Sequence, residues 1–185
     1  MTEEDAGKSF ITLDMDETRE LRWNFRNMQK FESRAKDILK RHEVKNERGL
    51  LISSMAINTG FVLANFMKIA DILEAAVAAA IGVSGLEGKK GEPSEAAVAI
   101  QGYLDRGGDL ETLQKEIYHS YLLVNDPSSV GEWQDNVARE AEIKRINKEK
   151  AAAQVEIARM ELADDQKKIE ALKKASGSTP TDLPT

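Results

Sequence analysis

The chain contains no cysteine among its 185 residues. This absence excludes disulfide bonds, thiol nucleophiles and thiolate metal sites, and it fits a protein of a reducing compartment. Aromatic residues are also scarce, at 5% of the chain. With so few large rings, the core must be built from aliphatic side chains and alanine, which suits packed helices better than a β-sandwich.

The sequence also lacks a long hydrophobic run that is free of charge. The longest apolar stretch, residues 61–86, contains Lys68, Asp71 and Glu74. Because each of these groups is costly in the hydrocarbon of a bilayer, we expect a buried core helix and no membrane association. The first five residues are acidic and carry no apolar segment typical of a secretory signal. We therefore expect a cytoplasmic protein.

Residues typical of catalysis or metal binding are few. The only histidines are His42 and His119. His42 follows the apolar pattern of one predicted helix and His119 lies beside aromatic residues in another, which is more typical of packed or half-exposed side chains than of a catalytic base. Metalloprotease, dinucleotide-binding and phosphate-loop motifs do not occur. We expect no enzymatic activity, no cofactor and no metal site.

One short segment resembles an enzyme motif. Residues 10–18, FITLDMDET, fit the four hydrophobic residues followed by DxDxT that open the haloacid-dehalogenase-type phosphatases. That resemblance implies a phosphoryl acceptor at Asp14 and an acid/base at Asp16, beside Mg²⁺. Such a site needs several parallel strands, and no strand-like run follows Phe25. A polar turn is the simpler interpretation, which leaves the phosphatase as a remote alternative.

Alternating apolar and polar residues predict one β-hairpin near the N-terminus. The alternation occurs in residues 10–15 and again in residues 21–25. The second strand would place Leu21, Trp23 and Phe25 on one face, packed against the first helix. This hairpin is the only β-structure we expect.

The remaining sequence predicts helices, several with clear end signals. Ser94 and Asp109 are suitable N-caps, and Asp126-Pro127 stops a helix. Ser129 and Glu132 fit the capping box that starts another. The expected helices span residues 27–48, 50–57, 61–81, 95–104, 110–124 and 130–175.

These elements predict a mainly α protein in two parts. A disordered lead covers residues 1–9, and a compact domain of hairpin and helices covers residues 10–125. A long charged helix forms an arm over residues 126–175, and a disordered tail covers residues 176–185. Glycines recur at every third position from Gly82 to Gly91, inside the domain, and indicate a flexible loop.

Charge is unevenly distributed over the chain, whose net charge is −6. Residues 19–48 hold ten basic and five acidic side chains, a net charge of +5. A local basic face on an acidic protein favours an acidic protein partner over nucleic acid, although a solvated face is the simpler alternative. The candidate contact residues on this face are Arg22, Arg26, Lys30, Arg34 and Arg41.

The predicted arm carries ten basic and ten acidic side chains in residues 131–175. Its apolar spacing is interrupted at Lys150 and changes register near Val155, so we expect weak self-association at most. Either the arm is a solvated helix stabilised by i,i+4 ion pairs, or it docks on a long helical partner or a second copy of the chain. The candidate contact residues are Ile143, Ile146, Ile157 and Met160.

The segment 10–32 resembles the opening of the tail assembly chaperones of long-tailed bacteriophages and gene-transfer agents. Those proteins begin with a short hairpin followed at once by an amphipathic helix. The matching residues here are Ile11 to Leu13, Leu21 to Phe25, Met28 and the Phe31-Glu32 pair.

The likeness continues loosely through residues 61–81 and 95–124 and covers about two thirds of the chain. It implies a non-enzymatic chaperone that binds the tape-measure protein and helps tail-tube subunits to assemble in the host cytoplasm. A coiled-coil scaffold or another structural interaction protein is the alternative that the arm itself suggests.

Overall fold

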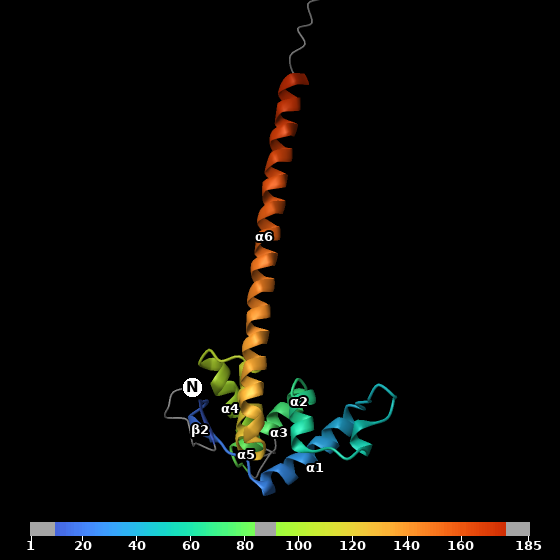
Figure 1. Ribbon diagram of the computed structural model, residues 1–185, viewed down its shortest axis with the longest axis vertical. Helices are drawn as coiled ribbons and strands as arrows, with labels where there is room; N and C mark the ends of the chain where they lie inside the picture. The colour runs from blue at the N-terminus through green and yellow to red at the C-terminus, as the bar shows by residue number, and fades with distance from the viewer. Residues whose placement is uncertain (1–9, 84–91, 177–185) are drawn as a thin grey trace, which may run out of the picture. The chain divides into compact units, whose positions relative to one another are not determined.

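The computed structural model describes residues 10–83 and 92–176. The chain is mainly helical, with a small N-terminal hairpin and a long C-terminal helix, which confirms the predicted fold class (Figure 1). The expected lead and tail and most of the glycine loop lie outside the described residues. The chain divides into two units, Met1–Val130 and Gly131–Thr185.

The hairpin consists of strands β1 (Ile11–Asp14) and β2 (Thr18–Leu21), which pair antiparallel with Ile11 opposite Leu21. The prediction that the second strand continues to Phe25 is wrong. Asn24 caps a helix instead, because its side chain accepts a hydrogen bond from the backbone N–H of Asn27. Phe25 is the first residue of that helix and is 71% exposed.

Helix α1 (Phe25–Arg41) buries Phe31, Ala35, Ile38 and Leu39, which share one face at helical spacing. The helix ends seven residues before the predicted end at residue 48. His42 caps it through a backbone bond to the Ile38 carbonyl.

The segment after α1 is a closed loop, whereas the apolar spacing predicted that the helix would continue. Glu43 adopts a left-handed φ of +49°, which no helix continues through. Lys45 then forms an isolated antiparallel bridge with Leu51. The predicted helix over residues 50–57 is reduced to a single 3-10 turn, Ile52–Ser54.

The long apolar run forms two helices, α2 (Thr59–Phe66) and α3 (Ala70–Ala80), where one was predicted. Extended backbone at Ile69 separates them. Most of α3 is buried because small alanine side chains allow the neighbouring helices to approach closely, and Gly82, with φ +77°, follows its end. Helix α3 contacts α1 and the hairpin strand β2 as well as the two helices that follow it in the chain, and it therefore forms the centre of the core.

Helices α4 (Glu95–Asp105) and α5 (Leu110–Asn125) begin at the predicted caps. Ser94 accepts from the N–H of Ala97 at 3.0 Å, and Asp109 accepts from the N–H of Thr112 at 2.9 Å. Both cap predictions are confirmed. α4 and α5 contact α3, so they complete the layer around the central helix.

The predicted packing of Trp23 is confirmed in part. The ring is 4% exposed and makes edge contacts with Phe31 and Tyr121, whose centroids lie 5.7 and 5.9 Å away. Its indole N–H donates to the Ser120 hydroxyl at 2.9 Å. Trp23 thus links the end of the hairpin to α1 and α5, whereas the neighbouring Phe25 takes no part.

The long helix α6 (Val130–Ser176) follows a 3-10 turn, Pro127–Ser129. The capping-box prediction is wrong in its geometry, because the Ser129 hydroxyl donates to the Asp126 carboxylate. Asp126 therefore organises the turn that precedes the helix. Within the described ranges, no helix has the length and apolarity needed to cross a membrane.

Candidate functional site

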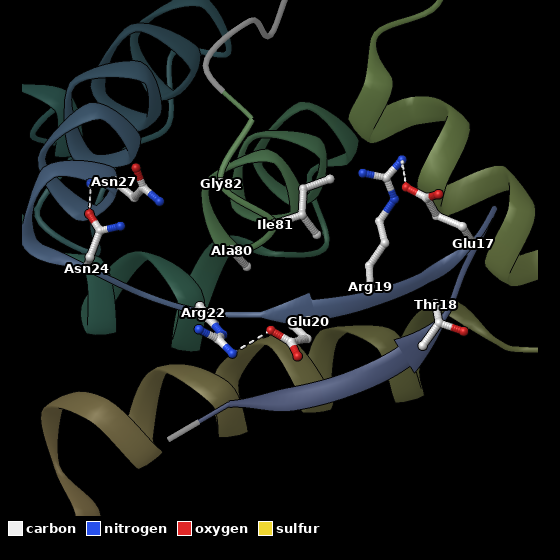
Figure 2. Close-up of a pocket in the computed structure, with 10 residues that line it drawn as sticks. All are labelled: Glu17, Thr18, Arg19, Glu20, Arg22, Asn24, Asn27, Ala80, Ile81 and Gly82. Atoms are coloured by element: carbon white, nitrogen blue, oxygen red, sulfur yellow. Dashed lines mark hydrogen bonds and ion pairs between the residues drawn. The ribbon is translucent and has the colours of Figure 1, made fainter. Parts of the chain in front are cut away.

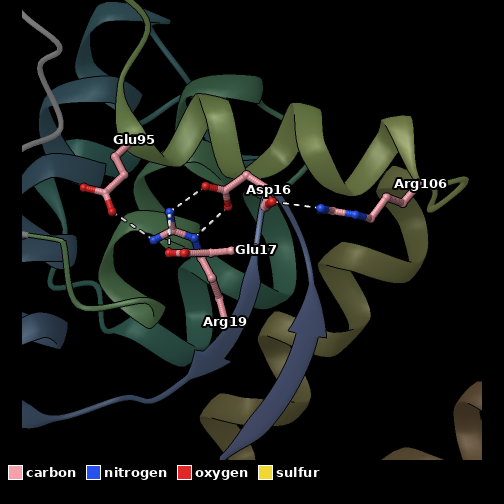
Figure 3. Close-up of polar contacts among 5 residues, drawn as sticks. All are labelled: Asp16, Glu17, Arg19, Glu95 and Arg106. Carbon is pink, nitrogen blue, oxygen red and sulfur yellow. Dashed lines mark hydrogen bonds and ion pairs between the residues drawn. The ribbon is translucent and has the colours of Figure 1, made fainter.

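A polar cluster fixes the turn of the hairpin to α4 (Figure 3). Arg19 donates two hydrogen bonds to Asp16, both at 2.7 Å, and a third to Glu95 at 2.9 Å. The guanidinium of Arg106 donates to the backbone carbonyl of Asp16 at 2.8 Å. The Arg19 side chain is only 13% exposed, so this cluster is a well-packed polar contact between the hairpin and α4.

Charge and hydrogen bonding explain the ionisation of this cluster. The hydrogen bonds from Arg19 hold the pKa of the Asp16 carboxyl below its ordinary value, although partial burial opposes that shift. The same hydrogen bonds raise the pKa of Arg19. Asp16 is therefore a carboxylate neutralised by a fixed cation, which is a poor arrangement for an acid/base group.

The geometry around Asp14 does not reproduce the phosphatase motif. Its carboxylate is 70% exposed and lies 3.5 Å from the Arg106 Nε. The strand that carries it pairs antiparallel in a sheet of two strands, whereas the phosphatase site needs a parallel sheet. In the part of the chain that the structure describes, no three acidic or histidine side chains gather into a metal-binding group.

The basic residues predicted on one face of α1 do share that face. Arg26, Lys30, Arg34 and Arg41 fall within about 80° of one another at 100° per residue. They lie opposite the side that buries Ala35. Three of the four are exposed, and Arg34 is half-buried.

One of these cations is paired with α3. Arg41 donates to Asp71 at 3.2 Å, and Arg34 and Arg41 line a cavity of about 190 Å³ together with Asp71 and Glu74. The charges in this cavity balance, so it does not select an ion of one sign. The part of the face available to an acidic partner is the N-terminal half of α1, around Arg26 and Lys30.

Arg22, the fifth predicted basic residue, lies apart from α1 in the segment after β2. Its guanidinium pairs with Glu20 at 2.6 Å and stacks 4.3 Å from the centroid of the Phe10 ring. It also borders a cavity of about 440 Å³ between β2, the start of α1 and the end of α3 (Figure 2). The cavity is lined by Glu17, Thr18, Arg19, Glu20, Arg22, Asn24, Asn27, Ala80, Ile81 and Gly82.

The predicted contact residues of the arm form an exposed line on α6. Ile143, Ile157 and Met160 are 53, 58 and 62% exposed, and Ile146 is 37% exposed. At helical spacing these four side chains, with Ala153 between them, lie on one side of the helix. Hereafter we call Ile143, Ile146, Ala153, Ile157 and Met160 the isoleucine line.

The helix carries a second exposed line that was not among the predicted contact residues. Val155, Leu162 and Ile169 are 53, 65 and 52% exposed, and Leu172 is 69% exposed. Their angular positions place them mainly on the opposite side from the isoleucine line. Val155, Leu162 and Ile169 are seven residues apart in the sequence, a spacing that also fits a change of register along the helix.

The polar surface of α6 is held by local ion pairs. Arg145 bonds Glu142 three residues earlier and Glu149 four residues later, each at 2.7 Å. Such pairs stabilise a helix without a tertiary partner. The two apolar lines are therefore the parts of this helix whose burial against another molecule would release the most free energy.

No family model, no curated protein and no solved structure matches this chain.

Proposed function

We propose that the protein is a non-enzymatic assembly chaperone, as the resemblance to tail assembly chaperones implies, and that it binds other proteins through α6. The observation that carries this proposal is the exposed line of large apolar side chains on a helix of 47 residues. Exposed apolar lines of this length are typical of surfaces that pack against another helix. A tape-measure protein, as a long helical partner, fits such a surface.

The basic end of α1 supports the same proposal in a different way. Arg26 and Lys30 extend from a folded domain whose remaining charge is acidic overall. A local field of this kind orients an acidic segment of a partner and increases its association rate. The chaperone would then hold a partner by apolar contacts along α6 and guide it by charge at the domain.

Co-expression tests the proposal directly. The tagged protein is produced together with the tape-measure and tail-tube proteins of the same genome, and the soluble tape-measure protein that co-purifies is quantified. The variant Ile157→Glu/Met160→Glu should lose most of it, because each substitution places a charge within the apolar contact.

Ala152→Glu/Gln166→Glu is the matched control, since it adds the same charge on the side of α6 away from the isoleucine line. Equal capture by the wild type and both variants would show that α6 is not the binding surface. The variant Arg26→Gln/Lys30→Gln would then test whether the basic end of α1 binds instead. No capture of either tail protein by the wild type would contradict the tail-chaperone role itself.

A coiled-coil scaffold is the second candidate, and the two apolar lines on α6 favour it. A scaffold would assemble with itself and would need neither tail protein. An enzymatic role is tested separately by assaying a generic phosphoester with Mg²⁺. We expect no turnover that Asp14→Asn abolishes, and such turnover would replace the chaperone proposal with the phosphatase.

A further inference from the structure

The isoleucine line of α6 is symmetric about its own midpoint. Ile146 and Ile157 are equally far from the point between Ala151 and Ala152, and Ile143 and Met160 are also equally far from it. All four large side chains are exposed in the single chain. A helix with this arrangement offers the same surface when it is turned end over end.

We propose that two copies of the chain pair through α6 as antiparallel helices, centred between Ala151 and Ala152. Ile143 then faces Met160 of the second copy, and Ile146 faces Ile157 of the second copy. The two-fold symmetry repeats both contacts, which gives four layers of large apolar side chains.

Lys150, which interrupts the line in the single helix, fits this pairing. It faces Ala153 of the second copy, and the small alanine leaves room for the lysine stem to pass while the ammonium reaches water. The break in the apolar spacing therefore lies where the antiparallel partner has a small residue.

Charge at both ends of the line selects the antiparallel direction. Arg139 faces Asp164 of the second copy, and Asn136 faces Lys167 of the second copy, so unlike or neutral groups meet. In a parallel pair in register, each of four charged seam residues would face its own copy: Arg139, Lys150, Asp164 and Lys167. Four like-charge contacts at seam positions make the parallel pair unfavourable.

The apolar contacts also select the register. Sliding one helix by seven residues keeps the same face inward but sets Ile146 against Asp164 and Ile143 against Lys167. That register would bury isoleucines against charged groups and lose the large apolar layers. In the proposed register Glu149 lies near Glu156 of the second copy, so we expect a weak dimer that dissociates on dilution.

Disulfide cross-linking tests direction and register, because the natural chain has no cysteine to interfere. Full-length Ile143→Cys and Met160→Cys are mixed and oxidised mildly. We expect the mixed disulfide to dominate, since residues 143 of the two copies lie about 25 Å apart in the proposed pair, beyond the reach of a disulfide. If Ile143→Cys links mainly to itself, the pair is parallel. If Ile143→Cys links preferentially to Lys167→Cys, the pair has the shifted register. Either result would overturn the proposal.

Sedimentation equilibrium on the full chain tests the surface itself. Ile146→Glu/Ile157→Glu should raise the dimer dissociation constant at least about tenfold, because it removes two apolar layers and adds charge. Ala151→Glu/Ala158→Glu adds the same charge on the opposite side and should change it little. A wild type that stays monomeric at every concentration, or a dimer lost only in the alanine variant, would contradict the inference. The second copy and the tape-measure protein would compete for the same isoleucine line, so sedimentation of the protein alone, without a tail protein, tests the dimer separately from the chaperone role.

Discussion

Isoleucine side chains of the helical core and isoleucine side chains of α6 differ sharply in their exposure to solvent. Ile38, Ile72 and Ile117 are at most 1% exposed, whereas Ile143 and Ile157 on α6 are more than half exposed. The helices of residues 10–130 are stabilised by a shared core, and α6 is stabilised by ion pairs within one helix. The difference shows that helical spacing alone does not tell a core from a contact surface.

The same contrast separates the two kinds of polar interaction. In the first unit, Arg19 and Trp23 make hydrogen bonds to residues 76 and 97 positions away in the chain. On α6, Arg145 bonds residues three and four positions away. Long-range bonds fix a tertiary structure, and local bonds preserve a helix that remains free to bind. Four substitutions test this contrast, from the largest expected effect to the smallest.

Trp23→Ala should lower the free energy of unfolding by about 3–5 kcal/mol. It removes a buried ring that contacts Phe31 and Tyr121 and leaves the Ser120 hydroxyl without its indole donor. Urea denaturation measures the loss. Phe25→Ala is the control, and as an exposed site it should change stability by less than about 0.5 kcal/mol. Equal losses in both variants would mean that the hairpin is not fixed to the core by Trp23.

Gly102→Ala should destabilise the first unit by about 1–3 kcal/mol, even though alanine favours helices. A Cβ at Gly102 in α4 would lie 2.5 Å from the backbone of Asp16, which cannot move without shifting the hairpin. Gly131→Ala near the start of α6 meets no atom within 4 Å, so it should be neutral or slightly stabilising. Thermal denaturation of both variants compares the packed and the open helix, and a stabilised Gly102→Ala would show that the hairpin does not pack on α4.

Asp16→Asn should remove part of the acid sensitivity of the first unit. Because Arg19 lowers the pKa of Asp16 in the folded state, the stabilisation from this pair is complete above the ordinary aspartate pKa of about 3.9. It is lost as the pH falls through the lower folded-state pKa. Stability measured between about pH 5 and pH 2 should therefore fall less in the variant, by on the order of 1 kcal/mol. An identical fall in both proteins would show that the pair does not stabilise the fold.

Arg145→Ala should have the smallest effect. It removes the pairs with Glu142 and Glu149 on the surface of α6 and should reduce the helical circular dichroism signal slightly at low salt. The difference should disappear at high salt, because exposed ion pairs are screened. A large loss of helix, or loss of the core transition, would mean that α6 depends on more than local pairs.

Local signals in the sequence predicted the parts of the fold that depend on neighbouring residues. The caps at Ser94 and Asp109 were recognised because a side-chain oxygen and an N–H three residues later suffice to form them. The end of a helix at Asp126 was also recognised from a neighbouring residue, because Pro127 has no N–H to donate. The existence of the hairpin and the long helix was predicted on the same basis, although the second strand lies at Thr18–Leu21 and not at residues 21–25.

Features that depend on tertiary contact were not predictable. The break between α2 and α3 falls at Ile69, where the sequence shows neither glycine nor proline, and a mostly apolar run has no clear period that marks a bend. Phe25 was assigned to the core because strand alternation extended across Asn24, which caps a helix instead. The bond between Ser129 and Asp126 competed with the expected capping box.

The candidate surfaces were only partly predictable. Helical spacing grouped the basic residues of α1 and the isoleucine line correctly. The spacing could not show that Asp71 of α3 would neutralise Arg41, because the two residues are 30 positions apart. The spacing also did not identify Leu162 as a candidate contact residue. Leu162 is exposed because no other helix in the described part of the second unit packs against α6.

Amide hydrogen exchange of the full chain, at low and at high protein concentration, tests the account most directly. In dilute protein, amides of α1 and α3 should exchange slowly and those of residues 143–160 quickly, because only the first group shares a core. Raising the concentration should slow exchange in residues 143–160 and leave α1 and α3 unchanged, as expected if a second copy covers the isoleucine line. Slow exchange of residues 143–160 in dilute protein, with no dependence on concentration, would contradict the account.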